Sequence, residues 1–286
     1  MIDLQLLKNK EIEDMIIIAD DLSQKNLEDK MSAHKIYQSL IDKIPNIYEY
    51  PYAAIRGELR NKIWKLEKKF NWNDSFYSQF GQDKFINDNF FRSYKNGFFV
   101  EIGAYDGISG SNCFYFEKFM NWKGIAIEPS QRQFESLQKN RSCQCVNKAV
   151  TKKIEKKEFI DVIQGYTMMS GIYDASYQKT LDIINADFKT NIQKKIIETS
   201  TFNQIVGNNN LIDYLSIDVE GGELEILNSI DFDFYDIKVI SVENNYPKEI
   251  AFNDLLLEKG FDYFDNIGVD EVYFNKKHLS LFGISS

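Results

Sequence analysis

The sequence predicts an α/β fold with a mostly parallel sheet, preceded by a helical N-terminal segment. From residue 98 onward, short runs rich in β-branched residues alternate with stretches of helical periodicity, which is typical of βαβ units. Before that point, apolar residues recur every three or four positions, which indicates helices. We therefore expect a helical extension over residues 1–72 and a sheet domain over residues 73–286.

The helical extension should contain three helices between residue 4 and about residue 70. Pro45 and Pro51 bound the turn between the second and third helices, because proline has no backbone N–H and biases the preceding residue away from helix. Three roles stay open for this segment, namely formation of a homodimer, coverage of a substrate cleft, and recruitment of a partner.

The sheet domain should contain seven strands in its main sheet. We expect strands at 98–102, 124–128, 144–147, 214–218, 238–243, 261–265 and 271–275. We expect helices at 112–121, 131–140, 222–229 and 248–259. The last two strands should pair antiparallel, because only a tight turn near 266–268 separates them. An insertion at about 151–210 is expected to carry two further strands, EFIDVI and KIIETSTF, around a helical middle, on the substrate side.

Composition excludes two classes of function. The net charge is −9, and no basic cluster with interleaved aromatic residues is present, so we expect no nucleic-acid partner. No run approaches the roughly 18 apolar residues of a membrane span. The first residues, MIDLQLLKNKEIED, lack the basic start and apolar run of a secretory signal. We therefore expect a cytoplasmic protein.

The segment FFVEIGAYDGISGSN at 98–112 predicts a strand that turns sharply into a helix beside a nucleotide. A dinucleotide fingerprint needs a second glycine where backbone approaches a pyrophosphate, but Tyr105 stands there. Gly103 and Gly107 keep the turn, and Glu101 adds a carboxylate at the end of the strand. A carboxylate attracts the ammonium and sulfonium groups of S-adenosylmethionine, which carries no phosphate, and would repel NAD.

The second strand, GIAIEP, ends in Glu128, which lies 25 residues after Gly103. This is near the spacing at which an acidic side chain binds ribose hydroxyls. The two acidic strand ends together indicate that one ligand binds between them, and they favour S-adenosylmethionine as that ligand. A tight turn without a ligand is the alternative.

At these residues the chain resembles the FkbM family of S-adenosylmethionine-dependent methyltransferases. The matching segments are YSQFGQDKFI at 77–86, FFVEIGAYDGISGSN at 98–112, WKGIAIEP at 122–129, NRSCQCVNKAV at 140–150, YLSIDVEGGELEIL at 214–227 and ISVENNY at 240–246. The resemblance covers about residues 75–275. It implies a class I methyltransferase (Rossmann-like) seven-stranded sheet of order 3-2-1-4-5-7-6, with the last-numbered strand antiparallel.

The resemblance also implies which residues bind the cofactor. The residues implied are Gln79, Glu101, Gly103, Ala104, Tyr105, Gly107, Ser111, Asn112, Glu128, Pro129, Ala149 and Asp218. The glycine loop would wrap the methionine part, Glu128 would bind the ribose, and Ala149 would lie at the adenine edge. Ser111 and Asn112 open a helix, where side-chain oxygens and free N–H groups can bind a carboxylate.

The SQFGQD motif at 78–83 has two interpretations. Gln79 and Asp83 would close over the cofactor, although the family usually has glutamate where Gln82 stands, so a charge-dependent role for that position is in question. The alternative is a capped turn that opens a helix.

Methyl transfer to oxygen requires a base, because a hydroxyl must lose its proton as it attacks. The ends of the fourth and fifth strands, LSIDVEGG and SVENN, should bring Asp218, Glu220 and Glu243 together as catalytic residues. Converging carboxylates either raise a pKa into the range of a base or bind a cation. For a magnesium ion, Asp218, Glu243 and Asn244 are the candidate ligands. The structural alternative is that Asp218 orients a loop and Glu220 caps the helix that follows.

Tyr166, Asn244 and Tyr246 are the candidate substrate residues, because the C–H faces of sugars pack on aromatic rings. The resemblance implies an O-methyltransferase of a sugar or nucleotide-sugar hydroxyl in surface polysaccharide or glycoconjugate biosynthesis. Two alternatives are methylation of a natural product or a lipid-linked group, and a non-catalytic scaffold with a degenerate cofactor pocket.

Overall fold

The computed structural model describes residues 9–92 and 94–283, so the predicted start of the first helix at residues 4–8 lies outside the described residues. Contacts divide the chain into two compact units. Residues 1–90 and 244–286 form what we call the helix–hairpin unit, and residues 91–243 form the sheet unit. A domain boundary at residue 72 stays a prediction.

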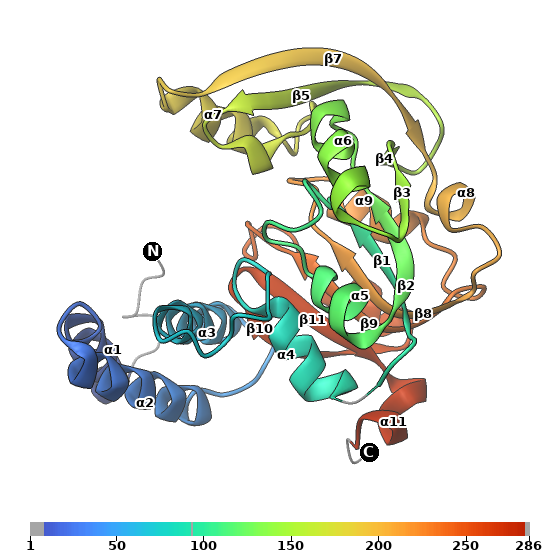
Figure 1. Ribbon diagram of the computed structural model, residues 1–286. Helices are drawn as coiled ribbons and strands as arrows, with labels where there is room; N and C mark the ends of the chain where they lie inside the picture. The colour runs from blue at the N-terminus through green and yellow to red at the C-terminus, as the bar shows by residue number, and fades with distance from the viewer. Residues whose placement is uncertain (1–8, 93, 284–286) are drawn as a thin grey trace. The chain divides into compact units, whose positions relative to one another are not determined.

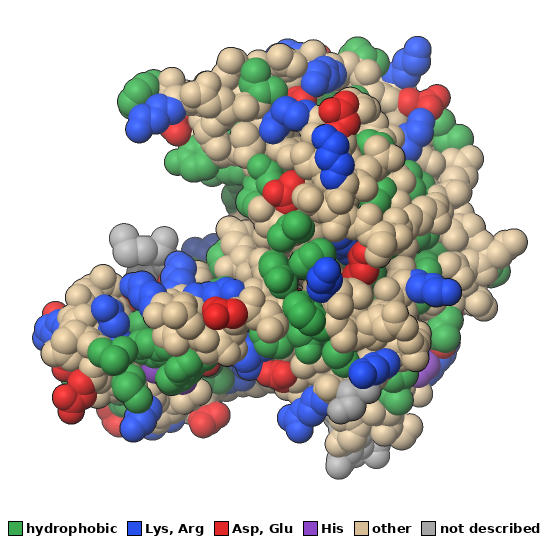
Figure 2. All heavy atoms as spheres, viewed as in Figure 1, with side chains coloured by type: hydrophobic (Ala, Val, Ile, Leu, Met, Phe, Trp, Pro, Cys, Tyr) green, Lys and Arg blue, Asp and Glu red, His purple; other side chains and the backbone are tan. Residues whose placement is uncertain are grey.

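The helix–hairpin unit contains the three helices predicted for the N-terminal segment (Figure 1). They are α1 Lys10–Leu22, α2 Leu27–Lys43 and α3 Tyr52–Lys69. Asn9 and Asn26 cap the first two helices, because each side chain accepts a hydrogen bond from a first-turn N–H group. Pro51 immediately precedes α3, which confirms the predicted turn. Figure 2 shows Lys and Arg side chains interspersed with Asp and Glu over these helices.

The C-terminal strands of this unit form the predicted antiparallel hairpin. Strand β10 (Phe261–Ile267) pairs with β11 (Asp270–Asn275), and Gly268 adopts φ +61° in the turn between them. The buried Arg56 of α3 donates to both carboxylate oxygens of Asp265 at 2.9 and 2.6 Å, which attaches the helices to the hairpin. The shorter elements are α4 Gln82–Ile86, η2 Asn87–Phe91, α10 Asn253–Glu258, η4 Lys276–His278 and α11 Leu279–Phe282.

Helix α10 is shorter than predicted, since the predicted helix began at residue 248 and the observed one begins at Asn253. Pro247 has no N–H to donate, and residues 246–250 form turns instead. The Asn244 side chain donates to the Ile250 carbonyl at 3.0 Å, which removes that carbonyl from helical bonding.

The sheet unit contains five parallel strands in the order β9-β8-β1-β2-β3. Their bounds are β1 Phe98–Ile102, β2 Lys123–Ile127, β3 Gln144–Val146, β8 Leu211–Ile217 and β9 Asp236–Glu243. The connecting helices are α5 Phe114–Met120, α6 Gln131–Asn140, α8 Phe202–Val206 and α9 Glu223–Ser229. This order confirms the first five positions of the predicted topology. With β10 and β11 of the other unit, the described residues supply seven strands of mixed direction.

The insertion forms a second sheet in the sheet unit, ordered β4-β7-β5-β6. Its elements are β4 Ala149–Val150, β5 Lys156–Gln164, η3 Thr167–Met169, β6 Gly171–Ile172, α7 Gln178–Ala186 and β7 Asn191–Ser200. Strands β5 and β7 pair antiparallel as a long ribbon with α7 at one end (Figure 1). The two further strands and the helical middle are therefore confirmed. No helix among residues 9–92 and 94–283 is long and apolar enough to cross a membrane.

Candidate active site

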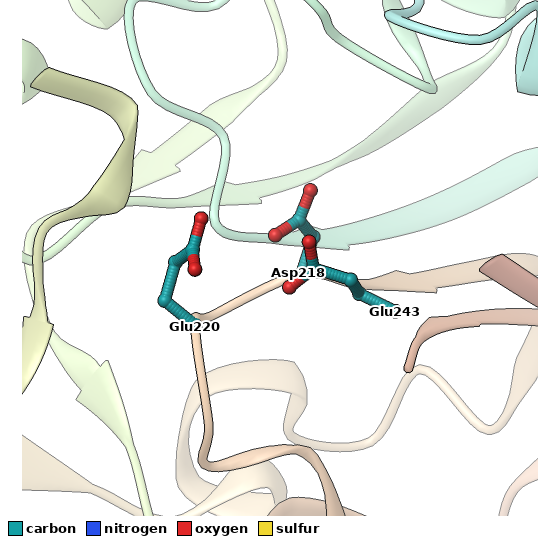
Figure 3. Close-up of side chains that lie close together, drawn as sticks. All are labelled: Asp218, Glu220 and Glu243. Carbon is teal, nitrogen blue, oxygen red and sulfur yellow. The ribbon is translucent and has the colours of Figure 1, made fainter. Parts of the chain in front are cut away.

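Three carboxylates gather where strands β8 and β9 end, as the sequence predicted. Asp218 directly follows β8, Glu220 lies two residues further, and Glu243 is the last residue of β9. The parallel register pairs Ile217 with Val242, so both strands end at the same edge of the sheet. One oxygen from each carboxylate lies within 4.8 Å of the other two, and the three side chains point toward one another (Figure 3).

The carboxylate cluster has unusual protonation behaviour. Burial raises the pKa of Asp218 to about 6, with a smaller increase from the charge of Glu101, while a hydrogen bond with Glu243 opposes the increase. Burial, together with the nearby charges of Asp218 and Glu223, raises the pKa of Glu220 to about 8. Within the described part of the chain, neither Asp218 nor Glu220 forms an ion pair with lysine or arginine. The cluster can therefore hold and release a proton near neutral pH.

The turn after β8 holds Glu220 in a strained conformation. Its backbone adopts φ +63°, a region that costs a non-glycine residue about 1–3 kcal/mol and is common at functional sites. Glu223 accepts hydrogen bonds from the N–H groups of Val219 at 3.1 Å and Gly221 at 3.0 Å. Helix α9 has Gly222 as its N-cap and receives no side-chain cap from the described residues, so the interpretation of Glu220 as a helix cap is wrong, and Glu223 instead holds the turn that precedes the helix.

The glycine loop after β1 lies directly against Asp218. Gly103 adopts φ +91°, and a Cβ atom added there would lie 1.7 Å from the Asp218 carbonyl oxygen. At Gly107, an added Cβ would meet the side chains of Leu137 and Arg141 at 2.7 Å. The sequence predicted ligand contact at both glycines, but close packing within the protein already requires them. The fully buried Ala104 lies between them.

Glu101 is buried and its charge is neutralised by the protein. One oxygen accepts from the Ser111 hydroxyl at 2.7 Å and the Asn112 N–H at 2.8 Å. The other accepts from Arg141 at 2.9 Å. Glu101 is therefore already paired within the protein, and its contact with the cofactor stays a prediction. The carboxylate that Ser111 and Asn112 bind is the protein's own, and their contact with a cofactor stays a prediction.

Arg141 is the residue that sequence analysis missed in this region. Its side chain is fully buried, and it donates to Glu101, to Glu117 at 2.5 Å and to the Gly107 carbonyl at 3.1 Å. It thereby connects the glycine loop, α5 and the end of α6. Its partners lie 24 to 40 positions away in the chain, so neither periodicity nor local spacing indicates the cluster.

Glu128 lies beside the glycine loop, as predicted for a ribose ligand. Its two oxygens accept from the N–H groups of Tyr105 at 2.9 Å and Ser130 at 2.7 Å. Burial raises the pKa of Glu128 to about 8 despite these two donors. Pro129 and Ala149 line one cavity of about 270 Å³ next to Glu128, so the residues predicted for the ribose and adenine lie close together.

The insertion contacts both halves of this site. The Tyr105 hydroxyl forms a hydrogen bond with Thr167 at 2.7 Å, and Tyr166, which is about half exposed, precedes Thr167 in the chain. A Cβ atom at Gly221 would lie 3.1 Å from the Ser176 hydroxyl. The insertion therefore lies against the glycine loop and the Glu220 turn, which is consistent with its expected position on the substrate side.

Comparison with known protein families identifies the family of this chain. The family model described as methyltransferase FkbM domain matches residues 101–263, which is more than half of the chain. The chain belongs to the FkbM methyltransferase family. The match contains the end of β1, the glycine loop, Glu128 and the whole carboxylate cluster. Comparison with curated proteins gave no match.

Solved structures with related folds are distant from this FkbM domain in sequence. Methyltransferase FkbM from Methylobacillus flagellatus KT is 12% identical with a TM-score of 0.43, and the match covers 83% of this chain and 57% of that one. A methyltransferase from Pyrococcus furiosus is 13% identical, with a TM-score of 0.36 and coverage of 77% and 97%. A variant of MtNAS in complex with S-adenosylmethionine is 10% identical, with a TM-score of 0.38 and coverage of 93% and 98%.

The predicted residues of the SQFGQD motif, which precedes the FkbM match, lie in the helix–hairpin unit and form a capped turn. Asp83 is buried and accepts from the Ser78 hydroxyl and from the N–H groups of Tyr77 and Lys84. Gln82 accepts from the Phe80 N–H, whereas Gln79 is exposed. These contacts favour the capped turn, and closure over a cofactor stays a prediction.

The side chain of Asn244, which was predicted as a metal ligand, is already hydrogen-bonded within the protein. Its side-chain oxygen accepts from the Tyr246 N–H at 3.1 Å, and its amide nitrogen donates to Glu271 at 2.7 Å. Within the sheet unit, the third carboxylate beside Asp218 and Glu243 is that of Glu220. The carboxylates of Asp218, Glu220 and Glu243 therefore form the cluster, and a role of Asn244 as a metal ligand stays a prediction.

Proposed function

We propose that this chain is an S-adenosylmethionine-dependent O-methyltransferase that methylates a hydroxyl of a sugar or nucleotide-sugar in surface polysaccharide or glycoconjugate biosynthesis. One observation carries the proposal: the glycine loop, where the cofactor would bind, touches the backbone of Asp218, whose carboxylate belongs to the titratable cluster. A methyl donor at the loop and a base that accepts the hydroxyl proton are thereby adjacent.

The residues present fit a cationic cofactor without phosphate. Glu128 would bind the ribose hydroxyls, and Pro129 and Ala149 would line the adenine, since both border the cavity beside Glu128. Tyr105 occupies the loop position that a pyrophosphate would need, with φ +48°. Asp218 and Glu220 provide negative charge without a lysine or arginine partner among the described residues. When bound, the cofactor supplies a methyl group on a positively charged sulfur.

The carboxylate cluster would act on the acceptor hydroxyl. Asp218, whose pKa is raised to about 6, would accept the hydroxyl proton as the acceptor oxygen bonds to the methyl carbon and the bond from that carbon to sulfur breaks, releasing S-adenosylhomocysteine. Burial of Asp218 is the main cause of this raised pKa, and the charge of Glu101 adds a smaller increase. The proton then leaves the cluster to water, which restores the carboxylate for the next turnover.

A magnesium ion is the alternative use of the same cluster, with Asp218, Glu220 and Glu243 as its ligands. Full activity after exhaustive treatment with a chelator would exclude it. Methylation of a natural product or lipid-linked group remains the competing substrate class. A cytoplasmic location and a homodimer through the N-terminal helices stay predictions.

The decisive experiment is transfer of a radiolabelled methyl group from S-adenosylmethionine to a panel of nucleotide-sugars and neutral glycosides. We expect a methyl ether on one class of sugar, identified by mass spectrometry, with one equivalent of S-adenosylhomocysteine formed per ether. Methylation at nitrogen or carbon would contradict O-methylation. Failure to bind S-adenosylhomocysteine in calorimetry would leave the non-catalytic scaffold as the interpretation.

A further inference from the structure

The cavity of about 270 Å³ next to Glu128 has a second wall, which the insertion supplies. The first wall follows the ends of β2 and β3 and contains Pro129 and Ala149. The second wall contains Phe159 of β5 and Ile197 of β7. All of these residues belong to the sheet unit. Small-molecule sites commonly measure about 300–1,000 Å³, so a cavity of this size suits one ring system of a ligand.

Strand pairing places the second wall opposite the first. Strand β4 pairs parallel with β7, and Ala149 is the partner of Thr199. Ile197 lies two positions before Thr199, so both side chains are on the same face of β7. On the neighbouring strand, Phe159 pairs with Lys195, which is also on that face. The side chains of Phe159, Lys195 and Ile197 therefore share one face of the ribbon, and all three line the cavity.

This face of the ribbon offers apolar surface to a ligand. Phe159 is buried and Ile197 is partly buried in the lining. The preceding residue, Ile196, is 67% exposed and lies outside the lining. A purine has flat faces that pack on aliphatic and aromatic side chains. Ile197 is therefore placed to pack against such a ring, whereas Ile196 is not.

The charged side chains of the lining are paired within the protein. Lys148 forms an ion pair with Glu198, and Lys195 forms one with the buried Asp161 at 2.6 Å. A phosphate group would need a cation that is free to bind it, whereas an adenine ring is uncharged at neutral pH. The lining therefore favours the base of a nucleoside over a phosphate.

The insertion also contacts the predicted cofactor site at a second point. The Tyr105 hydroxyl forms a hydrogen bond with Thr167 of the insertion at 2.7 Å. The Tyr105 N–H donates to Glu128, the predicted ribose ligand, at 2.9 Å. The insertion thus reaches both the glycine loop and the cavity next to Glu128.

Resting on the proposed function, we propose that the ribbon of β5 and β7 is part of the cofactor site, where Ile197 packs against the adenine ring. The segments after β2 and β3 contact one side of the ring, and the ribbon contacts the other. The insertion then contributes to binding of the methyl donor, in addition to its expected role toward the acceptor.

The test uses the full chain with isotope-labelled isoleucine methyl groups and S-adenosylhomocysteine as the probe. Nuclear Overhauser effects between isoleucine methyl groups and the adenine protons H2 and H8 report direct contact. The Ile197→Ala variant assigns the Ile197 signals, because they disappear from its spectrum. Calorimetry then compares Ile197→Trp, whose larger side chain fills the cavity, with the matched control Ile196→Trp on the adjacent exposed residue.

We expect a nuclear Overhauser effect from Ile197 to at least one adenine proton, and none from Ile196. The affinity for S-adenosylhomocysteine should fall by about tenfold or more in Ile197→Trp, because the side chain occupies the space of the ring. In Ile196→Trp it should stay within about twofold of the wild type. If Ile197→Trp does not fold, Ile197→Ala should weaken binding by about threefold or more through loss of apolar contact.

Two results would overturn the inference. One is that S-adenosylhomocysteine binds the wild-type chain while its adenine protons show no nuclear Overhauser effect from Ile197. The other is that the Ile197 variants bind as tightly as Ile196→Trp. In both cases the observed binding leaves the proposed function standing. Absence of S-adenosylhomocysteine binding to the wild-type chain would instead remove the proposed function, and this inference with it.

Discussion

The carboxylates at the ends of β1 and β2 differ sharply from those at the ends of β8 and β9. Glu101 is paired with Arg141, and Glu128 accepts from two backbone N–H groups, so the protein supplies a donor for every oxygen. Asp218 and Glu220 face another carboxylate instead, and they have no lysine or arginine partner among the described residues. The first pair fixes the shape of the glycine loop, while the second concentrates negative charge that a cationic ligand and a proton can neutralise.

This difference indicates that some carboxylates of the sheet position neighbouring atoms, while others can exchange a proton. A carboxylate with donors on both oxygens is rigid and can position neighbouring atoms. Burial raises the pKa of Asp218 and Glu220, as it does that of Glu128, but these two face another carboxylate and not backbone donors, so they can exchange a proton near neutral pH. In the proposed mechanism, the cofactor contacts and the base therefore lie on different strands, which meet where Gly103 touches the Asp218 backbone.

The largest effect should come from removing the cation that pairs with the buried carboxylates near β1. Arg141→Leu would leave Glu101 and Glu117 buried without their cation. We expect the free energy of unfolding to fall by about 3–5 kcal/mol, as measured by urea denaturation. Arg132→Leu, near the opposite end of α6, is the control, because Arg132 is partly exposed and should change that free energy by less than about 1 kcal/mol. Equal stability of the two variants would show that the ion pairs of Arg141 do not stabilise the fold.

A smaller effect, confined to catalysis, should come from a substitution in the carboxylate cluster at the ends of β8 and β9. Asp218→Asn removes the proton acceptor while keeping the size of the side chain. We expect the rate of methyl transfer to fall by at least ~10², with the fold intact by circular dichroism. Asp161→Asn is a useful comparison, because Asp161 is buried and paired with Lys195 at 2.6 Å outside the cluster. A wild-type rate in Asp218→Asn would exclude it as the base.

The smallest effect concerns pH and stability. The pKa of Asp218 is raised to about 6 and that of Glu220 to about 8, whereas both are near 4 in an unfolded chain. Between about pH 4 and pH 8 the folded state holds protons that the unfolded state has released, so stability falls as pH rises. Glu220→Gln should reduce the slope of this decrease by about 1 kcal/mol per pH unit in urea denaturation without ligand. A variant with the wild-type slope would show that Glu220 titrates normally.

Much of the fold followed from local pattern. The bounds of β1 and α6 agree with the predicted ranges, and the hairpin follows from two strands that flank a glycine turn. The carboxylate cluster was predictable for a topological reason, since parallel neighbours end at the same edge of a sheet. In each case the signal lies in adjacent residues or in the strand order.

The charge pairing was not predictable from the sequence. Glu101 looked available to a ligand because nothing in its neighbourhood revealed Arg141, which lies 40 positions later. Asn244, a predicted metal ligand, likewise donates through its amide to Glu271, which lies 27 positions later. Long-range partners of this kind decide whether a polar group is available, and residue types near in sequence do not reveal them.

The most direct test of the proposed separation between cofactor-binding and proton-accepting carboxylates is calorimetric titration of S-adenosylhomocysteine into Glu128→Ala and Asp218→Asn. The account predicts that Glu128→Ala weakens binding by about 1–3 kcal/mol, through loss of the carboxylate that would bind the ribose. Asp218→Asn should bind as the wild type does, because S-adenosylhomocysteine lacks the positive sulfur that the Asp218 carboxylate would face. Equal weakening in both variants, or unchanged affinity in Glu128→Ala, would contradict it.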